Sequence, residues 1–291
     1  MAKRWMTRWA DPWAARWTRW RERWLRGRSG MAGVAIPDEL WHACLHDHPF
    51  TANSPPHLLA RLRPMCQQFL ASKEFHGAHG LQVTDAMALA IALQACLPVL
   101  HLGLRWYDDF VGIVVHPGAM RARRVHEDEH GLVHEFSEDL TGEAADQGPV
   151  TLSWEDVAQA AETASEGYNV VIHEFVHKLD LRGGQANACP PLPAGFMGLA
   201  SARQARAHWQ ATLQPAYEEF RQAVLAAERF APLVPQPWLD AYGATSPSEF
   251  FAVSAEAFFV ARAEFAREFP TLLPLYRAFF EGPPGPAPLT S

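Results

Sequence analysis

Cysteine is scarce in this chain. Only Cys44, Cys66, Cys96 and Cys189 occur among 291 residues, and no two of them form a C-x-x-C pair. Disulfide frameworks and thiolate zinc sites both need more cysteines or closer spacing. We therefore expect four reduced, buried thiols and neither of those two architectures.

Long apolar runs are also absent. No stretch reaches the roughly 18 apolar residues of a membrane-spanning helix, and the first residues lack the apolar core of a secretory signal. We therefore expect the protein to stay in the cytoplasm. Its content of 48% hydrophobic and 20% charged residues is typical of a soluble globular protein and argues against disorder, collagen or coiled coil.

Positive charge is scarce in most of the chain. Residues 1–30 hold nine Lys and Arg against two acidic residues, a local charge of +7, whereas residues 31–291 hold 16 against 30, a charge of −14. Binding nucleic acid through its phosphates needs a basic face on the folded domain. We therefore expect no direct nucleic-acid partner.

Tryptophan is concentrated at the N-terminus, where six of the eleven fall in the first 24 residues at intervals of three or four. On a helix beginning at Asp11-Pro12, the four tryptophans that follow would form one stripe flanked by arginines. Such a segment lies on anionic membranes or docks into a partner's groove. We expect peripheral membrane contact through residues 1–30 or, because Met31 could itself be the start, a stretch that is rarely translated.

Apolar periodicity predicts a mainly helical body with a short β-rich insertion. Four β-rich runs between 111 and 154, separated by Gly, Pro and acidic residues, predict a small sheet. No repeat or linker is evident, so we expect one α+β domain over 31–282 and a flexible proline-rich tail over 283–291. The helices that we expect cover residues 37–47, 56–75, 85–100, 154–164, 166–181, 201–229, 247–268 and 271–281.

The string NVVIHEFVHKLD at residues 169–180 contains H-E-x-x-H on an apolar helical background. Four helical residues turn the chain by about 400°, so His173 and His177 project about 40° apart and can reach one ion. Glu174 lies on the edge of the same face, where its carboxylate can take a proton from water. A catalytic zinc takes three protein ligands, so the string predicts one Zn²⁺ and a third ligand from elsewhere.

Other interpretations of the histidines have less support. If His173 and His177 were only structural, the flanking Val, Ile and Phe would hold both imidazoles in an apolar setting without evident partners, which is costly. His126, His130 and His134 also have i, i+4 spacing, but Gly131 and β-favouring neighbours make a helix there unfavourable. We expect surface or hairpin positions for these three, with a role on the substrate side as the alternative.

The third ligand is not determined by spacing. A metzincin-like motif would need Gly and His where Asp180 and Gly183 stand. No carboxylate follows Asp180 for more than 35 residues, which excludes a thermolysin-like glutamate about twenty residues on. The candidates that remain are Glu218, Glu219, Glu228, Asp240, Glu249 and Glu256, with His208 as a nitrogen donor.

Glu249 also has a purely structural explanation. Ser246-x-x-Glu249 with Pro247 in the first turn is a capping box, in which the glutamate need only cap a helix. Glu249 and Glu256 are seven residues apart and hence on one helical face among aromatic residues. An uncompensated carboxylate would be costly there.

Two strings together resemble a known family. HEFVHKLD preceded by NVVI, and DAYGATSPSEFFAV at 240–253, are similar to the Mlc titration factor A family of bacterial zinc peptidases, a gluzincin group related to the catalytic domain of anthrax lethal factor. The resemblance covers about 37–282, and residues 1–30 lie outside it. The other stretches that resemble the family are LPVLHLGLRWY at 97–107, GLVH at 131–134, QGPVTLSW at 147–154 and FPTL at 269–272.

The resemblance implies one zinc ion held by His173, His177 and Glu249. It implies Glu174 as the general base and Tyr242 as a hydroxyl donor to the oxyanion. A packing role is the alternative for Tyr242.

Two further carboxylates gain a role from the resemblance. Asp180 and Glu256 become candidates for orienting the ligand imidazoles, a role that such carboxylates commonly fill.

The resemblance also implies an activity, namely hydrolysis of peptide bonds, of the aminopeptidase type, in short substrates. Relatives are linked to control of the glucose phosphotransferase system through binding of the transcriptional repressor Mlc. A second expectation is therefore a regulatory protein that binds an Mlc-like repressor, with or without peptidase activity of its own. The residues themselves show no isolated motif for that binding.

Overall fold

The computed structural model describes residues 35–282 except 53, 119, 128–132, 141 and 145–147. Of residues 52, 120–127, 133–140 and 142–144 it describes the backbone alone. Segments 1–30 and 283–291 lie outside the described residues, so the division of the chain that we expect from its sequence stays a prediction. Among the described helices, none combines the length and the apolarity needed to cross a bilayer.

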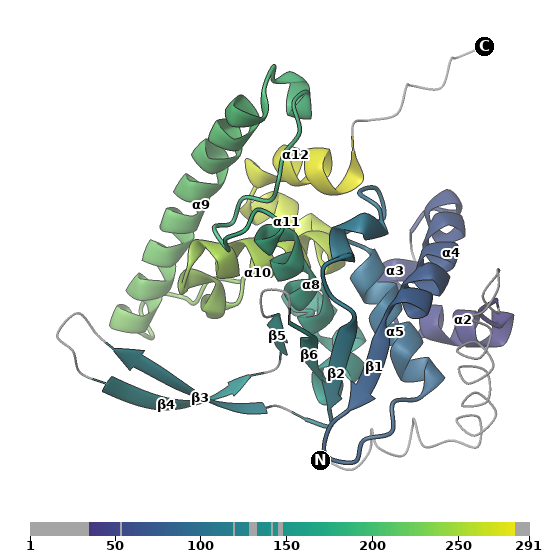
Figure 1. Ribbon diagram of the computed structural model, residues 1–291. Helices are drawn as coiled ribbons and strands as arrows, with labels where there is room; N and C mark the ends of the chain where they lie inside the picture. The colour runs from purple at the N-terminus through teal and green to yellow at the C-terminus, as the bar shows by residue number, and fades with distance from the viewer. Residues whose placement is uncertain are drawn as a thin grey trace.

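A four-stranded sheet runs through the middle of the body (Figure 1). Its order is β1 (Glu74–Gly77), β2 (Gly112–His116), β6 (Val150–Ser153) and β5 (Gly142–Ala144). The first three strands are parallel, with Ile113 opposite both Phe75 and Val150, and β5 pairs with β6 in the antiparallel sense. An antiparallel strand thus forms one edge of the sheet.

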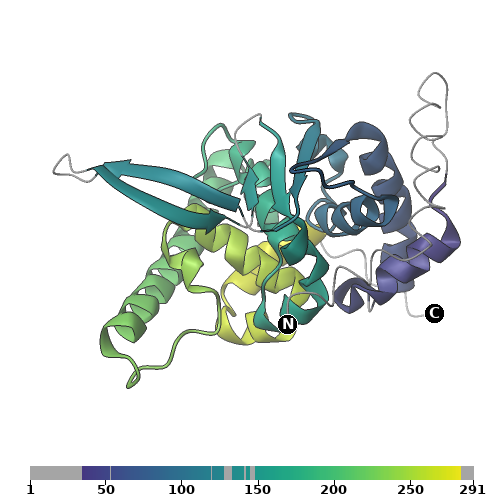
Figure 2. The same ribbon diagram turned by 90° about the horizontal axis from the view of Figure 1, so that it is seen from below.

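A separate hairpin connects β2 to β5. Strands β3 (Met120–Glu127) and β4 (Val133–Leu140) pair in antiparallel register with residue 126 opposite residue 134. The hairpin projects away from the body in both views (Figures 1 and 2). Residues 126 and 134 therefore lie on the strands of a hairpin, as expected, and their i, i+4 spacing to residue 130 does not have the meaning that it would have in a helix. Residue 130 itself lies outside the described residues.

Helices surround the sheet and form most of the body, which confirms the mainly helical α+β fold. The long helix α9 lies along one side of the molecule, and α2, α4 and α5 lie on the other (Figure 1). The α-helices are α2 (Asp38–His46), α3 (Pro49–Ala52), α4 (Pro56–Ser72), α5 (Asp85–Cys96), α6 (Trp154–Ala158), α7 (Ala160–Thr163), α8 (Val170–Leu181), α9 (Ala202–Phe230), α10 (Pro247–Val260), α11 (Arg262–Glu268) and α12 (Leu272–Tyr276). Shorter helical turns are η2 (Leu104–Tyr107), η3 (Ala164–Glu166), η4 (Phe196–Gly198), η5 (Ala241–Ala244) and the π turn η6 (Arg277–Glu281).

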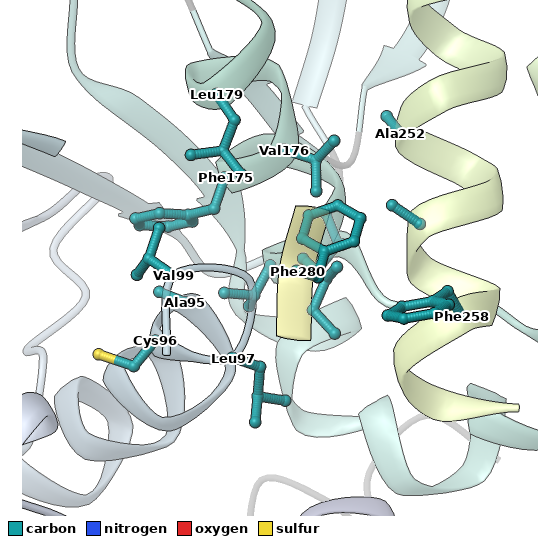
Figure 3. Packing of buried hydrophobic residues seen from close by; sticks show 14 of the residues in the cluster. Ala95, Cys96, Leu97, Val99, Phe175, Val176, Leu179, Ala252, Phe258 and Phe280 are labelled. Atoms are coloured by element: carbon teal, nitrogen blue, oxygen red, sulfur yellow. The ribbon is translucent and has the colours of Figure 1, made fainter. Parts of the chain in front are cut away.

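Helix α8 is the centre of the core. It packs against α5, α10 and the two strands β5 and β6. Val176 lies on the side of α8 that faces α10, whereas Phe175 lies on the side of Val99, which follows α5 (Figure 3). Both side chains and that of Leu179 are fully buried. A helix enclosed in this way has little freedom to move, so side chains on its remaining face are held rigidly.

Short polar side chains start the helices that matter for the site. Asn169 accepts from the backbone N–H of Ile172 at the start of α8, and Ser246 accepts from that of Glu249 at the start of α10. Both are typical N-cap interactions that satisfy an otherwise unpaired helical donor. Pro247 occupies the first turn of α10, where its missing N–H costs nothing.

The structure differs from the sequence prediction at several boundaries. The segment expected to be helical over 56–75 ends at Ser72, and the extended backbone of Lys73 leads into β1, a strand that was not expected. The segment expected over 166–181 begins only at Val170, because Gly167 has a φ of +81°. A Cβ at Gly167 would also lie 3.1 Å from the Trp238 ring, so a larger residue would be both strained and crowded there.

Two other segments are divided where the prediction had one helix. The segment expected over 154–164 forms α6 and α7, which are separated at Gln159, and its last residue begins η3. The segment expected over 247–268 forms α10 and α11, which are separated at Ala261. Ala261 has φ −135° and ψ +54°, which lies outside the helical region. Strands are present between 111 and 154 as expected, but they divide between the four-stranded sheet, to which β1 also belongs, and the separate β3–β4 hairpin.

The four cysteines are free and buried, as expected. Burial raises the pKa of Cys44 and of Cys66 well above the usual thiol value. Burial likewise raises the pKa of Cys189 to about 11. Neutral thiols of this kind act as small apolar side chains in a core.

Candidate metal centre

Helix α8 presents two imidazoles towards one point. The rings of His173 and His177 lie 4.7 Å apart between centroids, with an angle of 77° between their planes. Their Nε2 atoms are 3.1 Å apart. The i, i+4 geometry expected from the H-E-x-x-H string is therefore present, with both rings mostly buried.

Helix α10 completes the group with Glu249. Its Oε2 atom lies 3.1 Å from the Nε2 of His173 and 3.1 Å from the Nε2 of His177. Within the described part of the chain, these three residues are the one group of three or more His, Cys, Asp or Glu whose ligand atoms converge closely enough to hold an ion. The Glu249 side chain therefore points to the histidines, while the cap itself is made by the hydroxyl of Ser246.

The other candidates for a third ligand lie elsewhere. Glu218, Glu219, Glu228 and His208 lie on the exposed side of α9. The carboxylate of Asp240 instead accepts from the backbone N–H of Tyr242 and starts η5.

Glu256 determines which nitrogen of His173 carries a proton. Its Oε1 atom is 2.7 Å from the Nδ1 of His173, and the carboxylate is 1% exposed. An ionised carboxylate only accepts hydrogen bonds, so Nδ1 of His173 donates. The Nε2 lone pair of a neutral His173 ring then faces Glu249 and His177.

Ser248 has the corresponding function for His177. Its Oγ atom donates to Oδ2 of Asp180 at 2.8 Å and lies 3.3 Å from Nδ1 of His177. Because the Ser248 hydroxyl donates its one proton to Asp180, its oxygen accepts a hydrogen bond from Nδ1–H of His177. Asp180 thus acts on the imidazole through Ser248 rather than directly, a contact that the sequence prediction missed.

Asp180 also holds the loop that follows α8. Its two carboxylate oxygens accept from the backbone N–H groups of Ala188 and Cys189 at 2.8 and 3.0 Å. Burial raises the pKa of Asp180, and these hydrogen bonds, with that from Ser248, counteract the rise. One buried carboxylate therefore ties the loop to the metal-facing histidine.

The charges of the group favour a cation at its centre. Burial raises the pKa of Glu249, but the hydrogen bonds from His173 and His177 outweigh it, and the pKa lies well below the usual carboxyl value. Burial lowers the pKa of His173, but Glu256 and Glu249 outweigh it and raise the pKa well above the usual imidazole value. The three side chains therefore accommodate positive charge, which protons or a metal ion can supply.

The donor set fits a tetrahedral divalent metal. With bonds of about 2.0 Å, the ligand atoms of a tetrahedral zinc lie about 3.3 Å apart, close to the separation of 3.1 Å between all three pairs here. Two imidazole nitrogens and one carboxylate oxygen are a common catalytic zinc set. Both histidines have a partner on the far nitrogen, as metal-bound histidines usually do.

Glu174 and Tyr242 lie beside the three converging side chains. Glu174 follows His173 on α8, is 3% exposed, and contributes to the raised pKa of that histidine. The Tyr242 ring in η5 lies 6.1 Å from the His173 ring between centroids. The residues that the family resemblance implies for the site thus lie in this region of the fold.

Some supporting residues had a signal that the sequence prediction did not use. Asn169 precedes the apolar run of α8 and is a typical N-cap residue, which would also have placed the start of the helix correctly. Ser248 precedes Glu249, but nothing in its spacing indicates that it contacts a histidine 71 residues away.

Comparison with known proteins agrees with this geometry. Residues 17–281 match the family described as glucose-regulated metallo-peptidase M90. The match begins at residue 17, inside the segment 1–30, so the expectation that this whole segment lies outside the resemblance is wrong.

Several similar proteins carry one name, Mlc titration factor A. The protein of Salmonella arizonae is 33% identical over 249 residues, which are 85% of this chain and 92% of the relative. The protein of Klebsiella pneumoniae is 33% identical and that of Salmonella paratyphi B 32% identical, each over 238 residues, which are 81% of this chain and 83% of the relative. The chain belongs to the glucose-regulated metallo-peptidase M90 family, and it is a metallopeptidase with a His-His-Glu cluster on helices α8 and α10.

Proposed function

We propose that the protein is a zinc-dependent peptidase, of the aminopeptidase type, that acts on short peptides. The observation that carries this proposal is the convergence of three metal-binding atoms, each 3.1 Å from the other two. His173, His177 and Glu249 would hold the ion. When bound there, zinc lowers the pKa of water and polarises a carbonyl group.

Glu174 is the general base in this proposal. It takes a proton from the attacking water and passes it to the amine that leaves when the peptide bond breaks. Its buried position next to His173 supports this role, because proton transfer by a side chain needs a fixed location close to the reacting atoms. Asp180 and Glu256 orient the two imidazoles, Asp180 through Ser248 and Glu256 directly.

Tyr242 donates a hydrogen bond to the oxygen that becomes negative on the scissile carbonyl. Its ring lies beside His173, and Asp240 holds the backbone of that turn through the Tyr242 N–H. A donor placed where charge develops stabilises the transition state more than the substrate.

The sheet offers a place for an extended peptide. Strand β5 is the last strand of the sheet, runs antiparallel to β6, and packs against α8 (Figure 1). Edge strands bind extended peptides through backbone hydrogen bonds, largely without regard to side chains. A peptide that adds to β5 would therefore run past the helix that carries His173 and His177.

The test is hydrolysis of a panel of aminoacyl and peptide substrates by the wild-type protein and Glu174→Gln, with zinc measured in the same samples. We expect zinc in both proteins and turnover in the wild type only. Full activity in Glu174→Gln would refute the assignment of the base. Preference for free N-terminal amines over N-acetylated peptides would establish the aminopeptidase type, and equal cleavage of both would exclude it.

A second candidate function is binding of an Mlc-like transcriptional repressor. Its support is the name that the relatives carry, Mlc titration factor A. Capture of a purified Mlc-like repressor from the same organism by the wild-type protein and by Glu174→Gln is the test. Binding by both would show a regulatory function separate from catalysis, and binding by neither would exclude it.

Residues 1–30 carry a third proposal, peripheral contact with anionic membranes, supported by their charge of +7 and their regularly spaced tryptophans. Co-sedimentation with anionic vesicles, with and without this segment, tests it. Equal sedimentation of the two proteins would exclude the contact.

A further inference from the structure

Three polar side chains outside the proposed chemistry are buried in the core behind the metal-binding group. His48 follows α2, Gln94 lies on α5, and Asn169 precedes α8, and none is more than 3% exposed. Isolated polar groups in such a place would be costly, so their hydrogen bonds account for their presence.

These side chains form a continuous chain of hydrogen bonds. Nδ1 of His48 lies 2.7 Å from the carbonyl oxygen of Cys44, and its Nε2 lies 3.2 Å from Nε2 of Gln94. Oε1 of Gln94 accepts from Nδ2 of Asn169 at 2.7 Å. The backbone N–H of Asn169 donates to Oε2 of Glu256, whose other oxygen accepts from His173.

The donors and acceptors of this chain of hydrogen bonds match in only one arrangement. Nδ1 of His48 must donate to the carbonyl of Cys44, so its Nε2 is an acceptor for the amide NH₂ of Gln94. If Gln94 were rotated, its NH₂ would face the NH₂ of Asn169, and neither could accept. Asn169 in turn needs its own oxygen for the N–H of Ile172.

We propose that Gln94 is a positioning residue for the metal site. Gln94 fixes the amide of Asn169, which starts α8 with its side chain and holds Glu256 with its backbone N–H. Glu256 then fixes the tautomer and the orientation of His173. This inference rests on the proposed metal function, and it adds a residue that lies three hydrogen bonds from the ligand.

The matched variants are Gln94→Met, Gln94→Glu and Tyr107→Phe. Methionine keeps the length of Gln94 and removes its three side-chain hydrogen bonds, with His48, with Asn169 and with the carbonyl oxygen of Ala90 on the same helix. Glutamate keeps an acceptor for Asn169 and offers its second oxygen to a protonated His48, although that oxygen cannot donate to the carbonyl of Ala90 as the amide does. Tyr107→Phe is the control, because Tyr107 is equally buried and its hydroxyl donates to the carbonyl of Ala95. Ala95 is the residue after Gln94, but this hydrogen bond is not part of the series that leads to Glu256.

The experiment measures zinc affinity by competition with a chromophoric chelator, starting from metal-free protein, with the free energy of unfolding measured in parallel. We expect Gln94→Met to lose about tenfold in zinc affinity, the lower end of the usual effect of residues that support ligands. Gln94→Glu should restore affinity to within about threefold of the wild type. Tyr107→Phe should lower stability and leave zinc affinity unchanged.

The outcomes separate this inference from the proposed function. Equal zinc affinity in Gln94→Met and in the wild type would overturn the positioning role, and so would equal losses in Gln94→Met and Tyr107→Phe. Absence of zinc binding by the wild type would instead refute the metal function. If Gln94→Met does not fold, Asn169→Ser replaces it, because serine keeps a cap for Ile172 and loses the bond to Gln94. Wild-type affinity in Asn169→Ser would also overturn the inference.

Discussion

The ammonium group of Lys178 donates to the carbonyl oxygen of Gly148 at 2.9 Å and so ties helix α8 to the start of strand β6. Lys178 follows His177 and is fully buried. Gly148 lies just before β6, the strand that pairs with β5 at the edge of the sheet. Lys178, which follows the proposed metal ligand His177, therefore helps to fix the distance between the metal site and β5, the proposed peptide-binding edge.

Lys178→Met is expected to raise KM for peptides about three- to tenfold with a smaller change in kcat and unchanged zinc content, because the edge is displaced while the ligands stay. Steady-state kinetics with zinc analysis on the same protein are the measurement. Lys73→Met is the control. Lys73 is also buried and lies over the Phe110 ring like Lys178, but it donates to the carbonyls of Tyr107 and Phe110. A larger rise in KM for Lys73→Met would contradict the role of Lys178.

The two glutamates of α10 should differ in their effect on zinc. Glu249→Ala removes one of three converging atoms and is expected to abolish stable zinc binding. Glu256→Ala removes the partner of His173 Nδ1 and is expected to weaken affinity by about 10- to 100-fold. Chelator competition on metal-free protein measures both, and the reverse order would mean that Glu256 is the ligand.

Ser248→Ala is expected to weaken zinc affinity by about tenfold, because Nδ1 of His177 loses its acceptor and the ring can turn. The same chelator competition measures the change. Ser254→Ala is the control on the same helix, since Ser254 is buried and contacts the carbonyl of Phe250 and the hydroxyl of Tyr276. A loss of similar size in Ser254→Ala would show that α10 responds to any cavity and that Ser248 has no specific role.

Acid should destabilise the fold through His48. Burial lowers the pKa of His48, so the folded state disfavours its charged form. The neutral ring makes its full contribution to the free energy of unfolding above the ordinary imidazole pKa of about 6.5. This contribution is lost as the pH falls through the lower pKa that His48 has in the folded protein. Urea unfolding between pH 8 and pH 5 should show a smaller loss of stability in His48→Gln than in the wild type. An equal loss would exclude His48 as the source.

The helix that carries the two converging histidines could be predicted because its signal is local. The H-E-x-x-H string and its apolar flanks lie within 12 consecutive residues of α8. Glu249 was one of several candidates on spacing and became the preferred one only through the family resemblance. Glu249 reaches the two histidines because α10 packs against α8, and a single sequence does not show which helices pack together.

The supporting residues were harder to predict for a physical reason. Ser248, Gln94 and Asn169 act through partners 68 to 75 positions away along the chain. Strand β1 was missed because it has four residues, follows directly on a helix, and pairs with β2 nearly forty positions later. Features of this kind arise from tertiary contacts that local patterns do not encode.

The chain of amides from His48 to Glu256 also bears on how fast the protein takes up its metal. Because every member is already hydrogen-bonded in its only consistent arrangement, the scaffold has nothing to rearrange when an ion arrives. Uptake should then be limited by diffusion of the ion and by release of protons from the imidazoles, with no refolding step. One folded molecule could therefore gain and lose its metal ion many times as the supply of that ion rises and falls.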